Sequence, residues 1–368
     1  MTTYQIAWLG GDGIGPEVLD ATRTVLDSIG FRADYIPADI GWKFWCEEGN
    51  PLPERTLDVL RSTNCAIFGA ITSKPASDAA LELAPRLRSQ NLKYASPIVQ
   101  LRRQFNLFAN IRPARTFAPT ERPLDVIVVR ENTEGLYAGL EIHPTPQSLV
   151  GALDGARKLP HLRETSPADL ALSVRVTTRA GCERIVSRAF ELARSLGRKR
   201  VTLVEKANVL RATGGLMVEV ARSIAARFPE IEFREAHIDT ACMDLVRRPA
   251  EFDVIVAENL FGDILSDLTA GLSGGPGLAP SANIGETYAV FEPVHGSAPD
   301  IAGKGVANPC AAVLSACMML EWLGEHALAQ RLQSAVRRVL ADAQVKTPDL
   351  GGTATTKQMA SAIVAAAR

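Results

Sequence analysis

The sequence predicts an α/β protein with largely buried sheets. Strand-like and helix-like segments alternate along the chain. The strand-like runs are continuously apolar and rich in Val and Ile, as in strands covered on both faces. The length of 368 residues allows two lobes with separate hydrophobic cores.

The elements follow this alternation in order. Residues 4–10 (YQIAWLG) form a short apolar run that ends in glycine, which predicts a strand. Residues 17–30 (EVLDATRTVLDSIG) have helical spacing and a glycine stop. Residues 180–197 predict an amphipathic helix. The other predicted buried strands are 65–70 (CAIFGA), 124–132 (LDVIVVREN), 200–208 (RVTLVEKAN) and 252–260 (FDVIVAENL).

Residues 141–169 interrupt the alternation. They contain Pro, His, Gly and Ser with little periodicity, and the segment is too long for an ordinary connection. We interpret it as an excursion from the fold, such as an arm that lies on a partner subunit.

The composition is that of an ordinary soluble globular protein, with 22% charged and 46% hydrophobic residues. The net charge of −1 provides no overall field that would favour nucleic acid or an anionic membrane. We see no secretory signal, and the most apolar segment, 311–320, is too short to span a bilayer. None of the six cysteines forms a C-x-x-C motif, so we expect reduced thiols in a cytoplasmic protein.

The segment 9–18, LGGDGIGPEV, raises the question of a cofactor loop. The dinucleotide fingerprint is G-x-G-x-x-G after a strand, with an acidic residue about 20 positions further on. Gly11, Gly13 and Gly15 give G-x-G-x-G instead, and Pro16 stands where that pattern expects helix. Asp34 has a suitable offset but is weak support alone. A cofactor site and a tight turn therefore both stay open.

Three of the predicted buried strands end in polar residues. Ligands of α/β sheets bind beyond the carboxyl ends of strands, although such residues also cap helices. We favour a shared site over capping. The residues concerned are Arg130, Glu131, Asn132, Lys206, Asn208, Glu258 and Asn259.

Asp263 and Asp267 lie four residues apart, which places both carboxylates on one face of a predicted helix. Like charges so placed repel each other unless a cation lies between them or water solvates them. Apolar neighbours weaken the solvated alternative, and Asp239 is a candidate third ligand. Two or three carboxylates suit Mg²⁺ or Mn²⁺.

Several arginines lie among apolar residues between positions 102 and 130. Arg102, Arg112 and Arg130 are candidates for binding a polycarboxylate, because arginine binds carboxylates bidentately. For Arg103 and Arg115 we expect surface salt bridges. Lys206, at a strand end, is a candidate base and Tyr137 a candidate acid.

Six motifs together resemble the β-decarboxylating dehydrogenases, the isocitrate, homoisocitrate and isopropylmalate dehydrogenase family. The resemblance runs from residue 5 to beyond residue 350, with the motifs in the family's order. They are GDGIGPEV (11–18), VRENTEGLY (129–137), EKANVL (205–210), NLFGDILSDLTAGL (259–272), FEPVHGSAPDIAGKGVANP (291–309) and TPDLGG (347–352).

The resemblance implies an isopropylmalate-dehydrogenase-like two-domain fold and not a standard Rossmann fold. The large domain is expected from residues 1–107 and 274–368, and the small domain from 108–273, with an arm at about 138–170. It implies a homodimer or larger assembly with active sites shared between subunits. Neither nucleic acid nor membrane is an expected partner.

The resemblance also implies the reaction. The metal, held by Asp263, Asp267 and the partner subunit's Asp239, binds the hydroxyl and adjacent carboxylate of a hydroxy-polycarboxylate. Lys206, also expected from the partner, helps to deprotonate the hydroxyl as hydride leaves for NAD. CO₂ is then lost, and Tyr137 helps to protonate the enolate.

The implied cofactor is NAD, which lies against the loop 295–309. Asp300 and Ile301 occupy the positions that accept ribose hydroxyls, and a carboxylate there would repel the 2′-phosphate of NADP. The implied cofactor-binding residues are Ile14, Thr72, His295, Gly296, Ser297, Ala298, Asp300, Ile301 and Asn308.

Substrate choice is expected from the segment 94–102, YASPIVQLR. Ser96 matches the isocitrate enzymes, whereas Ile98 stands where they have Asn. The run 96–103, SPIVQLRR, looks most like that of the homoisocitrate enzymes. Glu205 departs from many family members, which have His there. We expect isocitrate or homoisocitrate, with isopropylmalate or a specialised 3-substituted malate as alternatives and a non-catalytic regulatory subunit as a third. The implied substrate-binding residues are Ser96, Ile98, Arg102, Arg112, Arg130 and Asn208.

Overall fold

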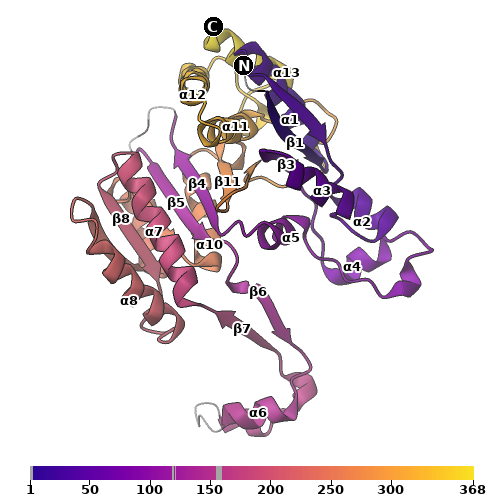
Figure 1. The fold of residues 1–368 in the computed structure, drawn as a ribbon, viewed down its shortest axis with the longest axis vertical. Coiled ribbons are helices and arrows are strands. Elements are labelled where there is room, and N and C mark those ends of the chain that lie inside the picture. The colour runs from indigo at the N-terminus through magenta and orange to yellow at the C-terminus, as the bar shows by residue number, and fades with distance from the viewer. Residues whose placement is uncertain (1–2, 118–119, 121, 155–159) are drawn as a thin grey trace.

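The computed structural model describes residues 3–117, 120, 122–154 and 160–368. One ten-stranded sheet runs through the body, and a two-stranded sheet stands apart from it (Figure 1). The strand order of the large sheet is β2-β1-β3-β12-β11-β4-β5-β10-β8-β9. The bounds are Tyr4–Gly11 (β1), Ala33–Pro37 (β2), Cys65–Ala70 (β3), Ala109–Arg115 (β4), Asp125–Glu131 (β5), Arg200–Glu205 (β8), Glu232–His237 (β9), Val254–Ala257 (β10), Pro280–Ile284 (β11) and Ala289–Pro293 (β12).

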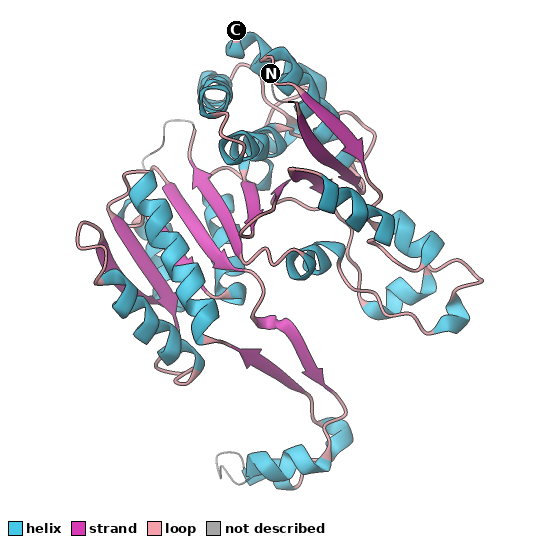
Figure 2. Cartoon of the chain, viewed as in Figure 1, coloured by secondary structure: helices cyan, strands magenta, loops and turns pink. Residues whose placement is uncertain are grey.

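Helices cover this sheet, so the predicted α/β class is confirmed (Figure 2). The predicted helix at 17–30 is α1, which Gly30 follows with a φ of +82°. The apolar segment 311–320 lies in α11, most of whose residues are buried. The helices are Gly15–Ser28 (α1), Trp42–Glu48 (α2), Glu54–Ser62 (α3), Ala76–Leu81 (α4), Pro97–Gln104 (α5), Gln147–Asp154 (α6), Arg179–Ser195 (α7), Thr213–Ala225 (α8), Ile238–Arg247 (α9), Asn259–Leu272 (α10), Cys310–Trp322 (α11), His326–Asp342 (α12) and Thr356–Ala367 (α13).

The large sheet has two halves that differ in their origin along the chain. Strands β2, β1, β3, β12 and β11 come from residues before 107 or after 274, and the other five from the stretch between. The halves meet where β11 pairs antiparallel with β4. In this pairing Asn283 of β11 lies opposite Asn110 of β4. The predicted domain division falls at this pairing. That the halves behave as separate domains stays a prediction.

Strands β5, β10, β8 and β9 run parallel to one another. Their carboxyl ends therefore lie at one edge of the sheet, and the polar residues that follow them are brought together there. This edge is where the candidate site is built.

The second sheet is a ribbon of two antiparallel strands, β6 (Gly135–Ile142) and β7 (Leu172–Val176). It extends away from the body and has α6 at its far end (Figure 1). We call the ribbon with the segment between its strands the arm. The excursion predicted at 141–169 belongs to it, and residues 155–159 of that prediction lie outside the described residues. Its contact with a partner stays a prediction.

All six cysteines lie in described segments and none of them forms a disulfide. Among the described residues, no helix combines the length and apolarity that crossing a bilayer requires.

Candidate active site

Backbone N–H groups of the glycine loop after β1 are hydrogen-bonded to carbonyl oxygens elsewhere in the same chain. The N–H groups of Asp12 and Ile14 donate to the carbonyl oxygens of Ala70 and Ser297, both at 2.9 Å. Gly13 has a φ of +56°, and a Cβ there would lie 2.0 Å from the Ser297 oxygen. A loop that cradles phosphate keeps its N–H groups free for the ligand. The loop therefore packs as a tight turn against the 295–309 loop, whereas contact of its residues with a cofactor stays a prediction.

The 295–309 loop connects β12 to α11 beside this turn. Thr72 and Ser297 share a hydrogen bond of 2.6 Å between their hydroxyls, and the Asp12 carboxylate accepts the Thr72 N–H at 2.9 Å. The structure thus brings together three of the predicted cofactor residues, Ile14, Thr72 and Ser297. Asp12, which holds Thr72, was not among the predicted site residues, although it stands inside the glycine motif.

The remaining cofactor candidates are spread along the same loop. His295 has a buried Nε2 with no partner among the described residues, beside the exposed Gly296, and burial lowers its pKa. Ala298 has a φ of +39°, and its carbonyl accepts the Ile301 N–H at 3.1 Å. Asp300 is exposed. The Asn308 amide is engaged at both ends, by Asp349 and by the Cys310 N–H.

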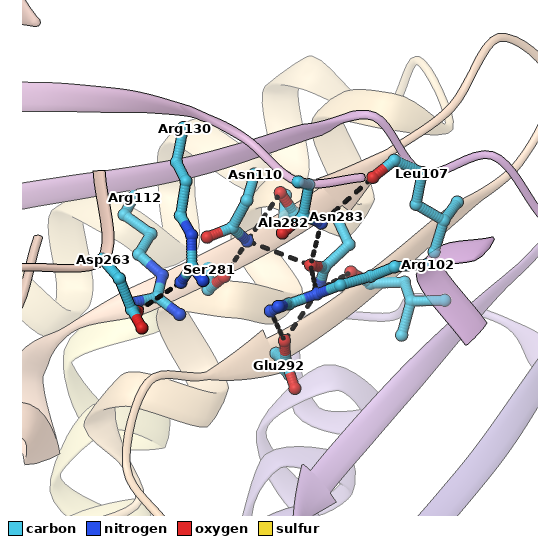
Figure 3. A network of polar contacts seen from close by, with 12 residues as sticks. Arg102, Leu107, Asn110, Arg112, Arg130, Asp263, Ser281, Ala282, Asn283 and Glu292 are labelled. Carbon is cyan, nitrogen blue, oxygen red and sulfur yellow. Dashed lines mark hydrogen bonds and ion pairs between the residues drawn. The ribbon is translucent and has the colours of Figure 1, made fainter. Parts of the chain in front are cut away.

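Three arginines converge at the β4–β5 and α5 side of the sheet edge. Arg102 reaches from α5 to Asn283 at 3.0 Å and to Glu292 at 3.5 Å (Figure 3). Arg112 and Arg130 extend from β4 and β5 toward Asp263. Their side chains are 7%, 11% and 2% exposed, respectively. Burial and the neighbouring guanidinium groups lower the pKa of Arg130 to about 10, so it stays charged at neutral pH.

Asp263 is the centre of this group. It forms ion pairs with Arg130 and with Arg112, the latter at 3.3 Å, and accepts a 2.5 Å hydrogen bond from the Tyr137 hydroxyl. Burial raises its pKa, but the two arginines and Tyr137 lower it below the ordinary aspartate value. Burial and the bond to Asp263 raise the pKa of Tyr137.

Asp267 lies one turn further along α10, as the spacing predicts. It pairs with Arg112 at 3.3 Å, and its side chain is 68% exposed. Two carboxylates therefore face Arg112 from one face of a helix. These are hard oxygen donors of the kind that Mg²⁺ and Mn²⁺ accept.

Lys206 and Asp239 form a second, separate pair. They follow the neighbouring parallel strands β8 and β9, where Glu205 lies opposite His237, and their side chains meet at 2.5 Å. The bond to Lys206 lowers the pKa of Asp239. Among the described residues no three His, Cys, Asp or Glu side chains of this chain form a metal-binding group. Asp239 thus does not join Asp263 and Asp267 within one chain.

Helix α5 carries the substrate-selectivity candidates. Ser96 precedes its first residue but makes no capping hydrogen bond, so its hydroxyl is not used by the helix. Ile98 is 9% exposed and packs in a hydrophobic cluster with Leu101 and Leu107. The structure thus gives Ile98 a packing role, whereas its contact with substrate stays a prediction. Asn208 lies exposed in the loop after Lys206.

The prediction of surface salt bridges holds for Arg115, which pairs with Asp125 at 2.5 Å. It is wrong for Arg103, which donates to the carbonyl oxygens of Tyr137 and Ala138 at 2.8 and 3.0 Å. The arm strand β6 comes close enough to α5 to offer these carbonyls, which no local spacing reveals.

Three other members of the site, Asn110, Asn283 and Glu292, were not found from the sequence. Glu292 and Asn283 fix the Arg102 guanidinium, and Asn110 donates to the Asn283 amide oxygen at 3.1 Å (Figure 3). Asn132, which the sequence did predict at a strand end, donates to the same oxygen at 2.9 Å. These contacts join α5, β4 and the residue after β5 to β11 and β12, across more than a hundred residues. Asn283 and Glu292 stand in strands with no polar run to signal them.

The fold and this site define a class of protein: an α/β enzyme with a turn-forming glycine loop, clustered arginines and paired aspartates at a sheet edge. A family model described as isocitrate/isopropylmalate dehydrogenase matches residues 5–363. The chain therefore belongs to the isocitrate/isopropylmalate dehydrogenase family, and is a dehydrogenase of that type.

Relatives with different substrates in their names are about equally similar. The chain is 43% identical to the isocitrate/homoisocitrate dehydrogenase of Thermus thermophilus, over 99% of this chain and 98% of the relative. It is 42% identical to the 3-isopropylmalate dehydrogenase of Archaeoglobus fulgidus, over 98% of each. A solved structure of isocitrate dehydrogenase from Methylococcus capsulatus matches over 100% of both chains with a TM-score of 0.86 and 42% identity. Protein DlpA of Legionella pneumophila is 42% identical, and the match spans 58% of its length.

Proposed function

We propose that the chain catalyses the NAD-dependent, divalent-metal-dependent oxidative decarboxylation of a 3-substituted malate, with isocitrate or homoisocitrate preferred. The products would be a 2-oxo acid, CO₂ and NADH. The observation that carries this proposal is the convergence of Arg102, Arg112 and Arg130 with Asp263 and Tyr137 at one edge of the sheet.

The charge of the cluster supports a polycarboxylate substrate. The three guanidinium groups face three carboxylates, those of Asp263, Asp267 and Glu292. A divalent cation on the two aspartates would leave an excess of two positive charges, which matches the two carboxylates of a malate. Buried arginines also supply fixed, bidentate donors for such groups.

The aspartates fit a hard divalent cation only in part. Asp263 and Asp267 supply two oxygen ligands, and Mg²⁺ or Mn²⁺ prefers more. Asp239 lies in a separate pair with Lys206, which supports a third ligand supplied by a second copy of the chain. When bound, the metal acts as a Lewis acid on the substrate oxygens.

Proton transfer falls to Tyr137 and Lys206. The raised pKa of Tyr137 keeps its hydroxyl protonated at neutral pH, as a proton donor must be. Asp263 fixes the direction of this hydroxyl. Lys206 lies at a strand end, where its amino group pairs with Asp239, and would take part in removing the proton of the substrate hydroxyl in the partner's site.

A homodimer with shared active sites is supported by exposed apolar side chains beside Asp263 and beside Asp239. Ile264 follows Asp263 directly, and Met243 lies one turn after Asp239; these two side chains are 46% and 49% exposed. Exposed apolar surface of this kind favours a partner. Further exposed apolar residues are Leu140, Leu153 and Val174 in the arm, Val209 shortly after Lys206, and Val246 at the end of α9.

The choice of NAD rests on Asp300, which is exposed on the 295–309 loop. Its carboxylate can accept ribose hydroxyls and would repel a 2′-phosphate.

The preference for a tricarboxylate rests on Ser96, whose hydroxyl is not engaged by α5. Isopropylmalate or a specialised 3-substituted malate is the alternative. A regulatory subunit is disfavoured because the lysine, the tyrosine and the three aspartates are all present.

The test is a panel of isocitrate, homoisocitrate, 3-isopropylmalate and malate, each with Mg²⁺ and either NAD or NADP. We expect the highest kcat/KM for a tricarboxylate with NAD, and no turnover after chelation. Turnover of none of them, with a folded protein, would favour the regulatory alternative. A higher kcat/KM for isopropylmalate would overturn the substrate assignment alone.

A further inference from the structure

Arg175, on the arm strand β7, places its charged group in a buried site. Its side chain is 10% exposed, although two of the five residues of β7 are exposed. The guanidinium forms an ion pair with Glu205, which is 3% exposed, and lies 3.9 Å from Glu258, which is 7% exposed. It also lies 5.3 Å above the ring of Phe261. One arginine of the arm therefore occupies a buried position between two carboxylates of the body.

These two carboxylates begin the two segments that carry the proposed chemistry. Glu205 ends β8, and its Oε2 accepts the backbone N–H of Lys206 at 2.7 Å. Glu258 caps α10 by accepting the Phe261 N–H at 2.8 Å, and that helix carries Asp263. Because β8 and β10 pair in parallel, their ends lie side by side.

The pairing is electrostatically necessary where it stands. Two buried carboxylates face one guanidinium. Removing one partner of such a pair strongly destabilises the folded protein, because a buried charge is left uncompensated. Burial already raises the pKa of Glu258, against the opposing effect of Arg175. Without Arg175 the Glu205 side chain would turn toward water and release the N–H of Lys206.

We propose that Arg175 is a positioning residue for Lys206, which acts through Glu205 and couples the arm to the strand end that carries this lysine. The proposal rests on the proposed function, in which Lys206 takes part in proton transfer. It also gives a role to Glu205, the position at which this chain departs from the family pattern.

The kinetic test compares Arg175→Met with Arg198→Met as a matched control. Arg198 also pairs with two aspartates, Asp125 and Asp253 at 2.7 and 2.9 Å, but at the amino ends of β5 and β10, the opposite edge of the sheet. We expect Arg175→Met to lower kcat by about tenfold or more, as for a misplaced proton-transfer group, with KM for the hydroxy acid within about threefold. Arg175→Lys should recover part of kcat, whereas Arg198→Met should affect only stability. A kcat of Arg175→Met equal to that of Arg198→Met, or a loss confined to KM, would overturn the proposal.

A second readout does not depend on turnover. Acetic anhydride labels lysine amines, and peptide mass spectrometry gives the labelling rate of Lys206 against Lys199, which is exposed. In folded Arg175→Met the relative rate of Lys206 should change by several-fold, and in Arg198→Met it should not. If the wild-type protein turns over no 3-substituted malate, the proposed function is contradicted. If Arg175→Met leaves the relative labelling rate of Lys206 unchanged, the positioning role is contradicted.

Discussion

The Tyr137 hydroxyl donates a 2.5 Å hydrogen bond to Asp263, which joins the arm strand β6 to helix α10. Arg130 lies 5.0 Å from the centre of the same tyrosine ring and pairs with the same aspartate. The candidate proton donor is thus held by a residue that is also a candidate metal ligand. Arg103 adds a third restraint, through the carbonyl oxygen of Tyr137.

Tyr137→Phe should lower kcat by about a hundredfold or more, because it removes a positioned proton donor. The stability cost should be about 1 kcal/mol, that of a single hydrogen bond. Steady-state kinetics and thermal unfolding measure the two effects. Tyr4→Phe is the control, since it removes a tyrosine hydroxyl bonded to Glu325 at 2.9 Å, far from the site in the sequence. Equal kcat values for the two variants would contradict the assignment.

Asp263→Asn should reduce stability as well as turnover, because Arg130 is 2% exposed and would lose its carboxylate partner. The cost expected for breaking such a buried pair is about 3 kcal/mol. The pKa of Asp263 is lowered in the folded state. Its contribution is therefore present above the pKa of a free aspartate, about 3.9, and is lost as the pH falls through the folded value.

Thermal unfolding across pH checks this prediction. The difference in Tm between wild type and Asp263→Asn should be largest near neutral pH, should begin to shrink below a pH of about 4, and should be lost once the pH falls through the lowered pKa of the folded carboxyl. A difference that does not depend on pH would show that the ion pair is not its source.

The residues at the strand ends and on α10 can be predicted from the sequence, whereas the partners that hold the arginines cannot. Residues after β5, β8 and β10 can be predicted to meet, because parallel strands end at one edge. Asp263 and Asp267 follow from helical spacing alone. By contrast, the contact of Arg102 with Glu292 spans 190 positions, and its partner stands in an apolar strand. Local periodicity carries no information about such pairs, nor about the arm carbonyls that Arg103 binds or the carboxylates around Arg175.

Asp267→Asn is the cleaner probe of the metal. Its side chain is 68% exposed and pairs only with Arg112 among the described residues. We expect a shift in Tm of less than about 4 °C, as for a loss of under 1 kcal/mol. The Mg²⁺ or Mn²⁺ concentration for half-maximal activity should rise at least about tenfold, since one charged ligand is lost. Unchanged metal dependence in this variant, or full activity in chelator-treated wild type, would remove the metal assignment.

Gly13→Ala tests whether the glycine loop supports the cofactor loop. Its Cβ would lie 2.0 Å from the Ser297 oxygen, so the 295–309 loop must move. Gly30→Ala is the control, because Gly30 has a φ of +82° and nothing within 4 Å of the added Cβ. Both variants pay the conformational cost of about 1–2 kcal/mol for a left-handed alanine. Only Gly13→Ala should also weaken NAD binding, measured by titration calorimetry. If the two variants bind NAD with equal affinity, the glycine loop does not support the cofactor loop.

Ser96→Ala tests the preference for a tricarboxylate. The Ser96 hydroxyl makes no capping hydrogen bond to α5, and Ser96 lies directly before this helix, six positions before Arg102. A site that hydrogen-bonds a substrate group discriminates more strongly than an apolar pocket does against one methylene. We expect kcat/KM for isocitrate and homoisocitrate to fall by about tenfold, the value of one hydrogen bond to a charged group, with that for isopropylmalate unchanged or raised. Ile98→Asn is a poor companion probe, because Ile98 is 9% exposed and packs in a hydrophobic cluster, where an amide would destabilise the fold. Competition between isocitrate and isopropylmalate, followed by product analysis, measures the ratio directly. If isopropylmalate is preferred by the wild type and Ser96→Ala leaves that preference unchanged, the substrate pocket is apolar and Ser96 does not face the distal group.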